Sequence, residues 1–120
     1  MERKMLKSKI HRATLTGADL HYEGSVTIDR DLMDAADILP YEAVSIWDVN
    51  NGSRFETYAI PGERTSGKVI LNGATAHLGK AGDRITIMSY TSVDSVLAKK
   101  WQPQVIVLGK DNAIIQERGI

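Results

Sequence analysis

Short runs in which apolar and polar residues alternate constrain the fold of this chain more than any other feature. In "AVSIWDV" (43–49), Val44 and Ile46 occupy one phase of a two-residue repeat, and "RITIMSY" (84–90) alternates in the same way. Successive side chains of a strand point to opposite faces, so each run predicts a half-buried strand. Two more continuous apolar runs predict strands buried on both faces, namely "KVIL" (68–71) and "QVIVLG" (104–109).

Turn-forming residues separate these runs. "NNGS" at 50–53 lies between two strand-like segments and predicts a β-hairpin. "IPGE" at 60–63 places Pro and Gly as a type II turn prefers them. The stretch "LHYEGSVTI" (20–28) reads as an alternating strand that a Gly-Ser pair interrupts.

Helices are predicted to be few and short. Residues 29–39 begin with Asp29 as a plausible N-cap, and the segments 73–82 and 92–101 could each hold a short helix. Many short strands with frequent glycine turns imply one closed or nearly closed β-barrel domain over residues 1–120. The polar end, 110–120, would either fray or pack on a neighbouring subunit.

Composition narrows the function classes. Fifteen basic and fifteen acidic residues cancel, so no net field draws the chain to nucleic acid or to an anionic membrane. The longest apolar run, "VIVL", is far shorter than the roughly 20 residues of a membrane span. The chain has no cysteine, which excludes disulfides and thiolate nucleophiles and suits a reducing cytoplasm. We therefore expect a soluble cytoplasmic domain without nucleic-acid or membrane partners.

Common catalytic motifs are missing. His11, His21 and His77 lack metal-ligand spacing, and no G-x-S-x-G pattern presents a nucleophilic serine. Each histidine is best interpreted as a surface or strand residue, and no metal is expected. The peptide bond between Gly24 and Ser25 is then the remaining candidate for chemistry, although a simple turn would explain that dipeptide on its own.

The order and spacing of many short segments decide between these two interpretations. The chain resembles the pyruvoyl-dependent L-aspartate α-decarboxylases, which supply β-alanine for pantothenate synthesis. The matching segments are "ML" and "K" within 5–9, "HR" (11–12), "ADLHYEGS" (18–25), "DAA" (34–36), "IW", "NG" and "RF" within 46–55, "TYAI" (57–60), "NGA" (72–74), "AH" (76–77) and "GD" (82–83).

The resemblance implies a double-psi β-barrel that assembles as a homotetramer with active sites between adjacent subunits. It also implies self-cleavage between Gly24 and Ser25 into a short chain, 1–24, and a longer chain, 25–120. Ser25 would become a pyruvoyl group that binds the amine of L-aspartate as a Schiff base, in place of pyridoxal phosphate. Sequence leaves open whether cleavage is spontaneous or needs a maturation factor.

The same resemblance assigns the other site residues. Tyr58 matches the proton donor, and a phenol keeps its proton at neutral pH. Arg54 and Lys9 match cations that contact the substrate carboxylates. Thr57 and Tyr22 are assigned to processing. Substrate contacts would also come from Thr57, Asn72, Gly73, Ala74 and Thr75.

Two positions depart from the family pattern, and one assignment meets a geometric objection. Thr75 stands where alanine is common, and Val26 replaces a small residue. Arg54 and Tyr58, four residues apart on a strand, share a face, whereas Thr57 would point to the other face unless a bulge re-aims it.

Two other functions stay open at this level. A non-catalytic small β-barrel could bind a ligand through a groove, in which case the chain would remain uncut. A relative of the same enzymes could instead decarboxylate another amino acid, such as glutamate.

Overall fold

A computed structural model describes residues 1–118, which form one mixed sheet of nine strands in the order β2-β6-β3-β5-β4-β7-β1-β8-β9. In chain order the strands are β1 (Glu2–Thr14), β2 (Gly17–Asp19), β3 (Ser25–Asp29), β4 (Ala43–Asp48), β5 (Arg54–Gly62), β6 (Val69–Asn72), β7 (Arg84–Asp94), β8 (Gln104–Leu108) and β9 (Ile114–Arg118). The short helices are α1 (Arg30–Ala36), η1 (Gly73–His77), α2 (Ser95–Ala98) and η2 (Lys110–Asn112). The prediction of a mainly β fold with a few short helices is confirmed, and the arrangement is consistent with a small β-barrel.

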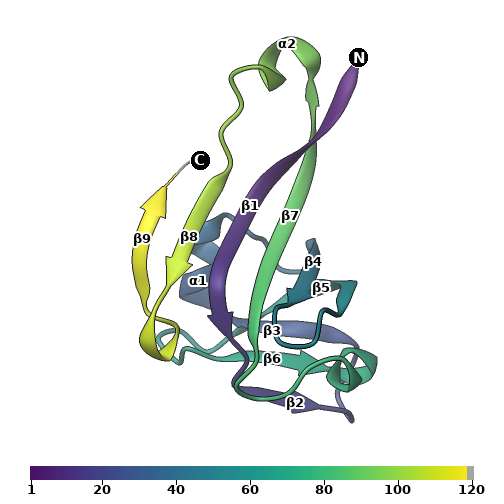
Figure 1. Cartoon of the computed structure of the whole chain (residues 1–120), viewed down its shortest axis with the longest axis vertical. Helices are drawn as coiled ribbons and strands as arrows, with labels where there is room; N and C mark the ends of the chain where they lie inside the picture. Colours follow the sequence, from purple (N-terminus) through teal and green to yellow (C-terminus); the bar gives the residue numbers. More distant parts are fainter. Residues whose placement is uncertain (119–120) are drawn as a thin grey trace.

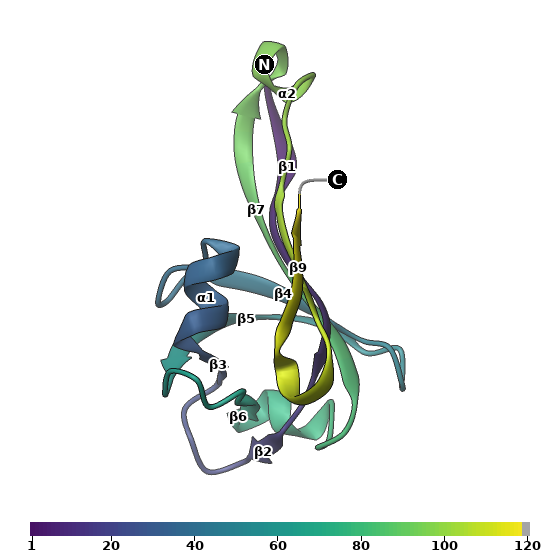
Figure 2. The ribbon, with the colours of Figure 1, turned by 90° about the vertical axis from the view of Figure 1, so that its left-hand side faces the viewer.

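The long strands β1 and β7 pair antiparallel and rise out of the body of the molecule, with α2 at their far end (Figures 1 and 2). This arm gives the molecule its longest dimension of 44 Å. At the opposite end, β3 pairs parallel to β5 and antiparallel to β6. The chain crosses between the two halves at Thr16, whose N–H donates to the carbonyl of Val69 at 2.8 Å.

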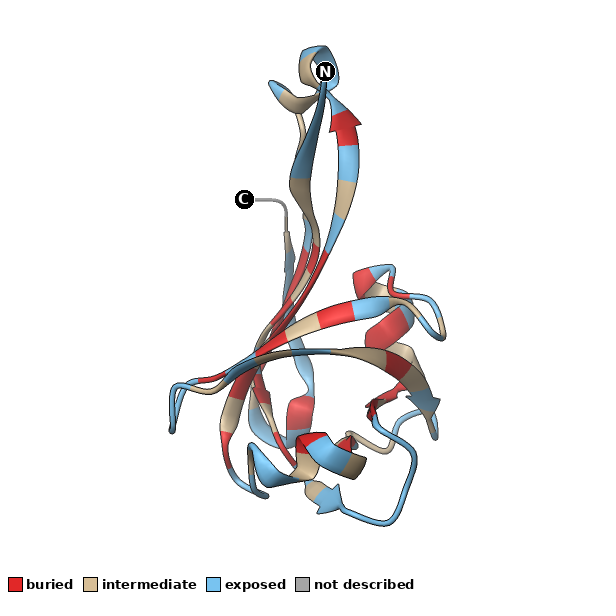
Figure 3. Ribbon diagram, turned by 90° about the vertical axis from the view of Figure 1, so that its right-hand side faces the viewer, coloured by how far each residue is buried: buried red, intermediate tan, exposed pale blue. Residues whose placement is uncertain are grey.

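Burial follows the alternation of the sequence. Val44 and Ile46 of β4 and Ile85 and Ile87 of β7 are almost fully buried. Figure 3 shows the buried residues gathered where the strands of the body face one another, while the arm carries more exposed residues. Burying these aliphatic side chains is the main stabilising contribution to the fold.

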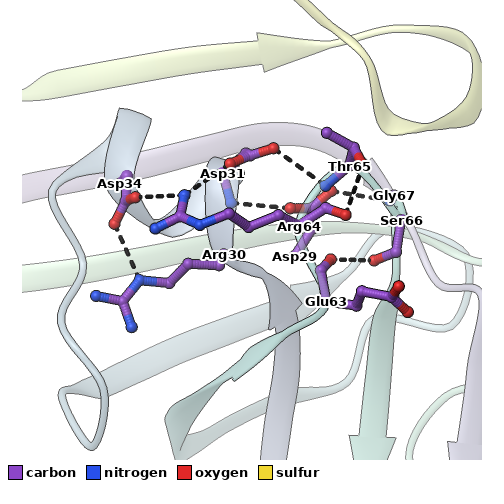
Figure 4. A network of polar contacts seen from close by, with 9 residues as sticks. All are labelled: Asp29, Arg30, Asp31, Asp34, Glu63, Arg64, Thr65, Ser66 and Gly67. Atoms are coloured by element: carbon purple, nitrogen blue, oxygen red, sulfur yellow. Dashed lines mark hydrogen bonds and ion pairs between the residues drawn. The ribbon is translucent and has the colours of Figure 1, made fainter.

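The α1 helix is fastened to the β5–β6 connection by a polar network (Figure 4). Asp29 caps α1 by accepting from the N–H of Asp31, and its second oxygen accepts from the N–H of Gly67 at 2.8 Å. Arg64 donates to Asp31 at 2.7 Å and to Asp34 at 2.8 Å. Hydrogen bonds from Arg64 and from Arg30 lower the pKa of Asp34. The N-cap predicted at Asp29 is therefore confirmed.

The predicted hairpin at 50–53 is confirmed, since it joins the antiparallel strands β4 and β5. The type II turn at 60–63 is wrong: Pro61 and Gly62 continue β5 in parallel register with β3. Beyond Tyr58 no β4 residue pairs with β5, so the missing N–H of Pro61 costs no ladder bond on that side.

Two further expectations need correction. The segment 20–28 is not one interrupted strand, because residues 20–24 form a loop and β3 begins at Ser25. The polar C-terminal segment does not fray before Arg118, because residues 114–118 form β9, paired with β8. Its last two residues lie outside the described range, and packing on a neighbouring subunit stays a prediction. Among residues 1–118, no helix has both the length and the apolar character needed to cross a membrane.

Candidate active site

Ser25 is the first residue of β3, and only 1% of its surface is exposed. Its hydroxyl donates to the carbonyl oxygen of Glu23 at 2.9 Å and accepts from Asn72 Nδ2 at 3.0 Å. Asn72 is also the antiparallel partner of Ser25 on β6. Strand pairing and two hydrogen bonds thus fix this hydroxyl on the N-terminal side of its own peptide bond, next to Gly24.

The amide of Asn72 uses both of its hydrogens here, because Nδ2 also donates to Thr27 Oγ1 at 2.9 Å. Thr75 follows in η1, where its buried hydroxyl donates to the carbonyl of Asn72 at 2.7 Å. The same hydroxyl lies 3.4 Å from the carbonyl oxygen of Ser25, a weak contact. The threonine at position 75, where alanine is common in the family, thus has a hydrogen-bond partner for its extra hydroxyl within the η1 turn.

Gly73 packs directly on the Gly24–Ser25 segment. Its φ is +66°, and a Cβ at this position would lie 2.8 Å from both Cα and N of Gly24. Only glycine satisfies the backbone angle and the close approach together. Gly24 itself is outside the left-handed region, and a Cβ there would meet no atom within 4 Å. Of these two glycines, Gly73 is therefore the one whose backbone angle and packing exclude other residues.

Strand β5 brings one predicted residue close to Ser25. The parallel register pairs Val26 with Ala59, so the same register extended by one residue brings Tyr58 beside Ser25, whereas Gly24 lies in the loop before β3. Tyr58 is half-buried, with its ring centroid 6.2 Å from that of Tyr41.

The geometric objection to Thr57 persists. No register shift interrupts β5 in its pairing with β4, so no bulge re-aims the side chain. Thr57 falls in the same phase as Phe55 and Ala59, which pack in or against the core. Its side chain therefore lies on the face opposite Arg54 and Tyr58.

The two predicted cations lie elsewhere on the sheet. Arg54, at the start of β5, stacks over the ring of Trp47 at 4.4 Å, and four strand residues, roughly 13 Å, separate it from Tyr58. Lys9 lies on β1 and pairs with Met88 of β7. Three strands, β5, β4 and β7, lie between β1 and β3 in the sheet. One chain therefore gathers Ser25, Asn72 and Tyr58, but not Lys9 or Arg54, around the Gly24–Ser25 bond.

A shallow groove of about 410 Å³ lies beside Asn72, the residue that holds the Ser25 hydroxyl. Tyr22, Thr27 and Asn72 line it together with residues of β2, and Tyr22 is half-exposed. Ala74 is exposed on η1 beside Gly73. Within residues 1–118, no three His, Asp or Glu side chains are grouped to hold a metal ion.

Comparison with known proteins identifies the family of this chain. The family model described as "Aspartate decarboxylase" matches residues 1–115. The chain belongs to the aspartate decarboxylase family. It is 58% identical over 114 residues to the aspartate 1-decarboxylase of Syntrophus aciditrophicus (strain SB), covering 95% of this chain and 98% of that protein. It is 55% identical over 112 residues to the aspartate 1-decarboxylase of Syntrophotalea carbinolica, covering 93% and 86% of the two chains.

This aspartate decarboxylase family member also contains a buried acid pair that sequence reasoning missed. Asp48 and Asp83 are 2% and 4% exposed, and Asp48 Oδ2 has no hydrogen-bond partner within residues 1–118, so burial beside a second carboxyl favours a proton on the pair. Burial raises the pKa of Asp48, and Asp83 raises it further, whereas Asp48 lowers the pKa of Asp83. A signal was available, because Asp48 continues the apolar phase of Val44 and Ile46.

The acid pair supports the site indirectly. Asp48 accepts from the N–H groups of Asn50 and Asn51 in the β4–β5 hairpin. Asn51 in turn donates to the carbonyl of Leu78 at 2.8 Å, and a Cβ on Gly79 would lie 2.9 Å from Asp48 Oδ2. The pair therefore joins the hairpin that leads to Arg54 to the segment that follows η1.

We expect Asp48→Asn to remove a pH dependence of stability. A carboxyl whose pKa is raised by folding contributes stability while it is protonated, and this contribution is lost as pH rises through the raised pKa. The asparagine amide can donate to Asp83 at any pH. Thermal unfolding from pH 4 to 9 should therefore show a melting temperature that falls with pH more steeply in the wild type than in Asp48→Asn. Glu2→Gln, which removes an exposed carboxylate, is the control, and parallel profiles for all three proteins would contradict the shared proton.

Proposed function

We propose that this chain is an aspartate 1-decarboxylase, which converts L-aspartate to β-alanine and carbon dioxide with a pyruvoyl group made from Ser25. The observation that carries the proposal is the buried Ser25 hydroxyl, held by Asn72 next to Gly24 in a chain of the aspartate decarboxylase family. β-Alanine made in this way would serve pantothenate synthesis in the cytoplasm.

Processing would begin with attack of Ser25 Oγ on the carbonyl carbon of Gly24. The C–N bond breaks, the nitrogen takes a proton, and the two segments become joined by an ester. Elimination of the Gly24 carboxylate, followed by hydrolysis with loss of ammonia, leaves the chains 1–24 and 25–120. On the basis of the family resemblance we assign to Thr57 the stabilisation of the oxyanion that develops during the attack, and its side chain would have to turn from the core-facing side of β5 to do so.

The residues around Ser25 fit a pyruvoyl group. Such a group would retain the backbone carbonyl of Ser25 near Thr75 Oγ1. Its keto oxygen would sit on the former Cα in place of the Ser25 nitrogen, and its methyl group would take the place of the side-chain CH2 beside Asn72 Nδ2. Its ketone supplies an electrophile that binds the substrate amine and withdraws the electron pair released with carbon dioxide. Asn72 Nδ2, which loses its bond to Ser25 Oγ, would be free to contact the group or the substrate, and Tyr58, which precedes Ala59 on β5, would return a proton to Cα of the substrate.

The substrate carboxylates need cations, and we propose that a neighbouring subunit supplies them. Arg54 and Lys9 lie on the face of the sheet opposite the core. Arg54 is about 13 Å from Tyr58 along β5, and three strands separate the strand of Lys9 from β3, the strand of Ser25. Stacking on Trp47 holds the guanidinium of Arg54 for paired hydrogen bonds to a carboxylate. A homotetramer with sites between subunits would bring such a cationic face to Ser25 of the adjacent chain.

Substrate identity can be tested by product analysis. Purified protein incubated separately with L-aspartate, D-aspartate and L-glutamate should form β-alanine from L-aspartate alone. Glutamate converted at an equal rate would indicate a decarboxylase of another specificity. Absence of product from a protein that carries a carbonyl trappable by hydroxylamine would reject the substrate, whereas absence of that carbonyl would reject the mechanism.

A complementation experiment tests the shared site. Ser25→Ala and Lys9→Ala should each be nearly inactive alone. Co-expressed in equal amounts, they should regain roughly a quarter of wild-type activity, because a quarter of the interfaces then combine an intact Ser25 with an intact Lys9 of the neighbour. Activity no higher than the average of the separate variants would place both residues in one chain's site.

A further inference from the structure

A second groove, of about 470 Å³, lies at the C-terminal end of β1, and the proposed reaction uses none of its residues. Arg12 and Arg84 line it from β1 and β7, and Lys110 lines it from η2. Its apolar wall consists of Leu108 and Ile115.

The positive charges of this groove are not balanced. The ion pairs formed within residues 1–118 use Lys7, Arg30 and Arg64, and none involves the three cations of the groove. Asp111 contributes a carboxylate to the same lining, which leaves two positive charges in excess. Unpaired cations held together repel one another, and this repulsion is relieved when an anion binds between them.

The backbone holds Arg12 in an unusual conformation. A register shift between β1 and β7 falls between Ile10 and Ala13, and Arg12 within it has a φ of +63°. A bulge of this kind re-aims a side chain, and a left-handed arginine is uncommon because its Cβ crowds the backbone. Asn112 anchors the other wall by donating to the carbonyls of Thr14 and Gly67.

The field of these cations reaches a neighbouring group. Burial lowers the pKa of His11, and the positive charges of Lys9, Arg12, Arg118 and Arg84 lower it further. The surroundings of Arg12 and Arg84 therefore carry a positive potential strong enough to disfavour a further positive charge.

We propose that this groove binds an organic phosphate, with its phosphate groups between Arg12, Arg84 and Lys110 and its organic body against Leu108 and Ile115. Guanidinium groups match phosphate oxygens with paired hydrogen bonds, and Lys110 adds a point charge. The volume is within the range of small-molecule sites and exceeds what an inorganic ion alone would fill. The apolar side chains of Leu108 and Ile115 should make the site prefer a phosphate that carries an organic group over inorganic phosphate.

Calorimetric titration of the purified protein at low salt tests this site, with ADP as the organic diphosphate, pyrophosphate as its inorganic counterpart and adenosine as the uncharged body. ADP should bind more tightly than pyrophosphate, and adenosine should not bind measurably. Arg84→Gln should weaken ADP binding about tenfold, and Arg84→Lys, which keeps the charge, by only about threefold. The exposed pair Lys99→Gln and Lys100→Gln on the distant arm is the matched control and should change ADP affinity less than twofold.

A second readout does not depend on these variants. ADP at saturation should raise the pKa of His11, measured by NMR titration of its ring protons, because a bound anion favours the imidazolium. If Arg84→Gln does not fold, the variant Lys110→Gln, at an exposed position, takes its place in the experiment and should also weaken ADP binding. No ADP binding, equal affinity for ADP in Arg84→Gln and wild type, or equal binding of adenosine and ADP would each overturn the site. Pyrophosphate binding as tight as ADP would overturn the role of the apolar wall.

Discussion

We expect the Ser25→Ala variant to remain a single chain of 13.2 kDa and to form no β-alanine. The wild type should separate into the pieces 1–24 and 25–120, the larger without a free amino terminus. Alanine offers no oxygen to attack Gly24, so neither the ester nor the ketone can form. Intact-mass analysis and a β-alanine assay on the same preparations measure both consequences.

The variant should stay folded, because alanine fits the space that Ser25 occupies. Asn72 keeps its hydrogen bond to Thr27 when the contact to Ser25 is lost. Losing the two hydrogen bonds of the Ser25 hydroxyl, to Glu23 and from Asn72, costs about 1–3 kcal/mol together, a fraction of the stability of a small domain. Loss of cleavage would therefore reflect missing chemistry and not unfolding.

Ser89→Ala is a matched control for this experiment. Ser89 is also 1% exposed on a strand, and its hydroxyl has no hydrogen-bond partner within the described residues. Cleavage and activity should survive this change. A Ser25→Ala protein that is cut, or that still decarboxylates aspartate, would show that the chemistry lies elsewhere. A wild-type chain that stays uncut and inactive would favour the non-catalytic binding module or a precursor that awaits a maturation factor.

Local sequence rules predicted the parts of the fold that depend on local interactions. The alternation of β4 and β7 and the cap at Asp29 reflect burial and hydrogen bonds within a few residues. The 13-residue strand β1 was missed, because its exposed basic half pairs with β7 about 90 residues later along the chain. The turn assigned at 60–63 failed for a related reason: long-range pairing with β3 overrides the local preference of Pro-Gly.

The candidate site shows the same division. Gly24, Ser25 and Asn72 could be named from their resemblance to a family, but the hydrogen bond from Asn72 to Ser25 spans 47 residues and required the β3–β6 pairing. The need for glycine at position 73 was not predicted, because it arises from the contact of its backbone with that of Gly24. Neither local propensity nor composition contains this information, since it arises where two distant segments meet.

The close contact between the backbones of Gly73 and Gly24 makes position 73 sensitive to substitution. We expect Gly73→Ala to destabilise the fold by about 2–5 kcal/mol, combining the strain of a left-handed alanine with overpacking against Gly24. Because the clash is with backbone atoms, η1 and the loop before Ser25 must move apart to relieve it. Asn72 and Thr75 would move with η1, so cleavage of the variant should slow by at least tenfold, given how steeply rates depend on reacting geometry.

Gly24→Ala is the matched comparison, because a Cβ there meets no atom within 4 Å and its φ is not left-handed. Both glycine variants are best compared for stability in the Ser25→Ala background, where the chain stays intact and urea unfolding reports on one covalent species. Gly73→Ala should shift the unfolding midpoint strongly, and Gly24→Ala should shift it little. Equal midpoints for the two would mean that the backbones of Gly24 and Gly73 are not in contact in solution. The position of Ser25 relative to Asn72 would then need another explanation, since this contact sets the distance between the loop that is cut and the turn that holds it.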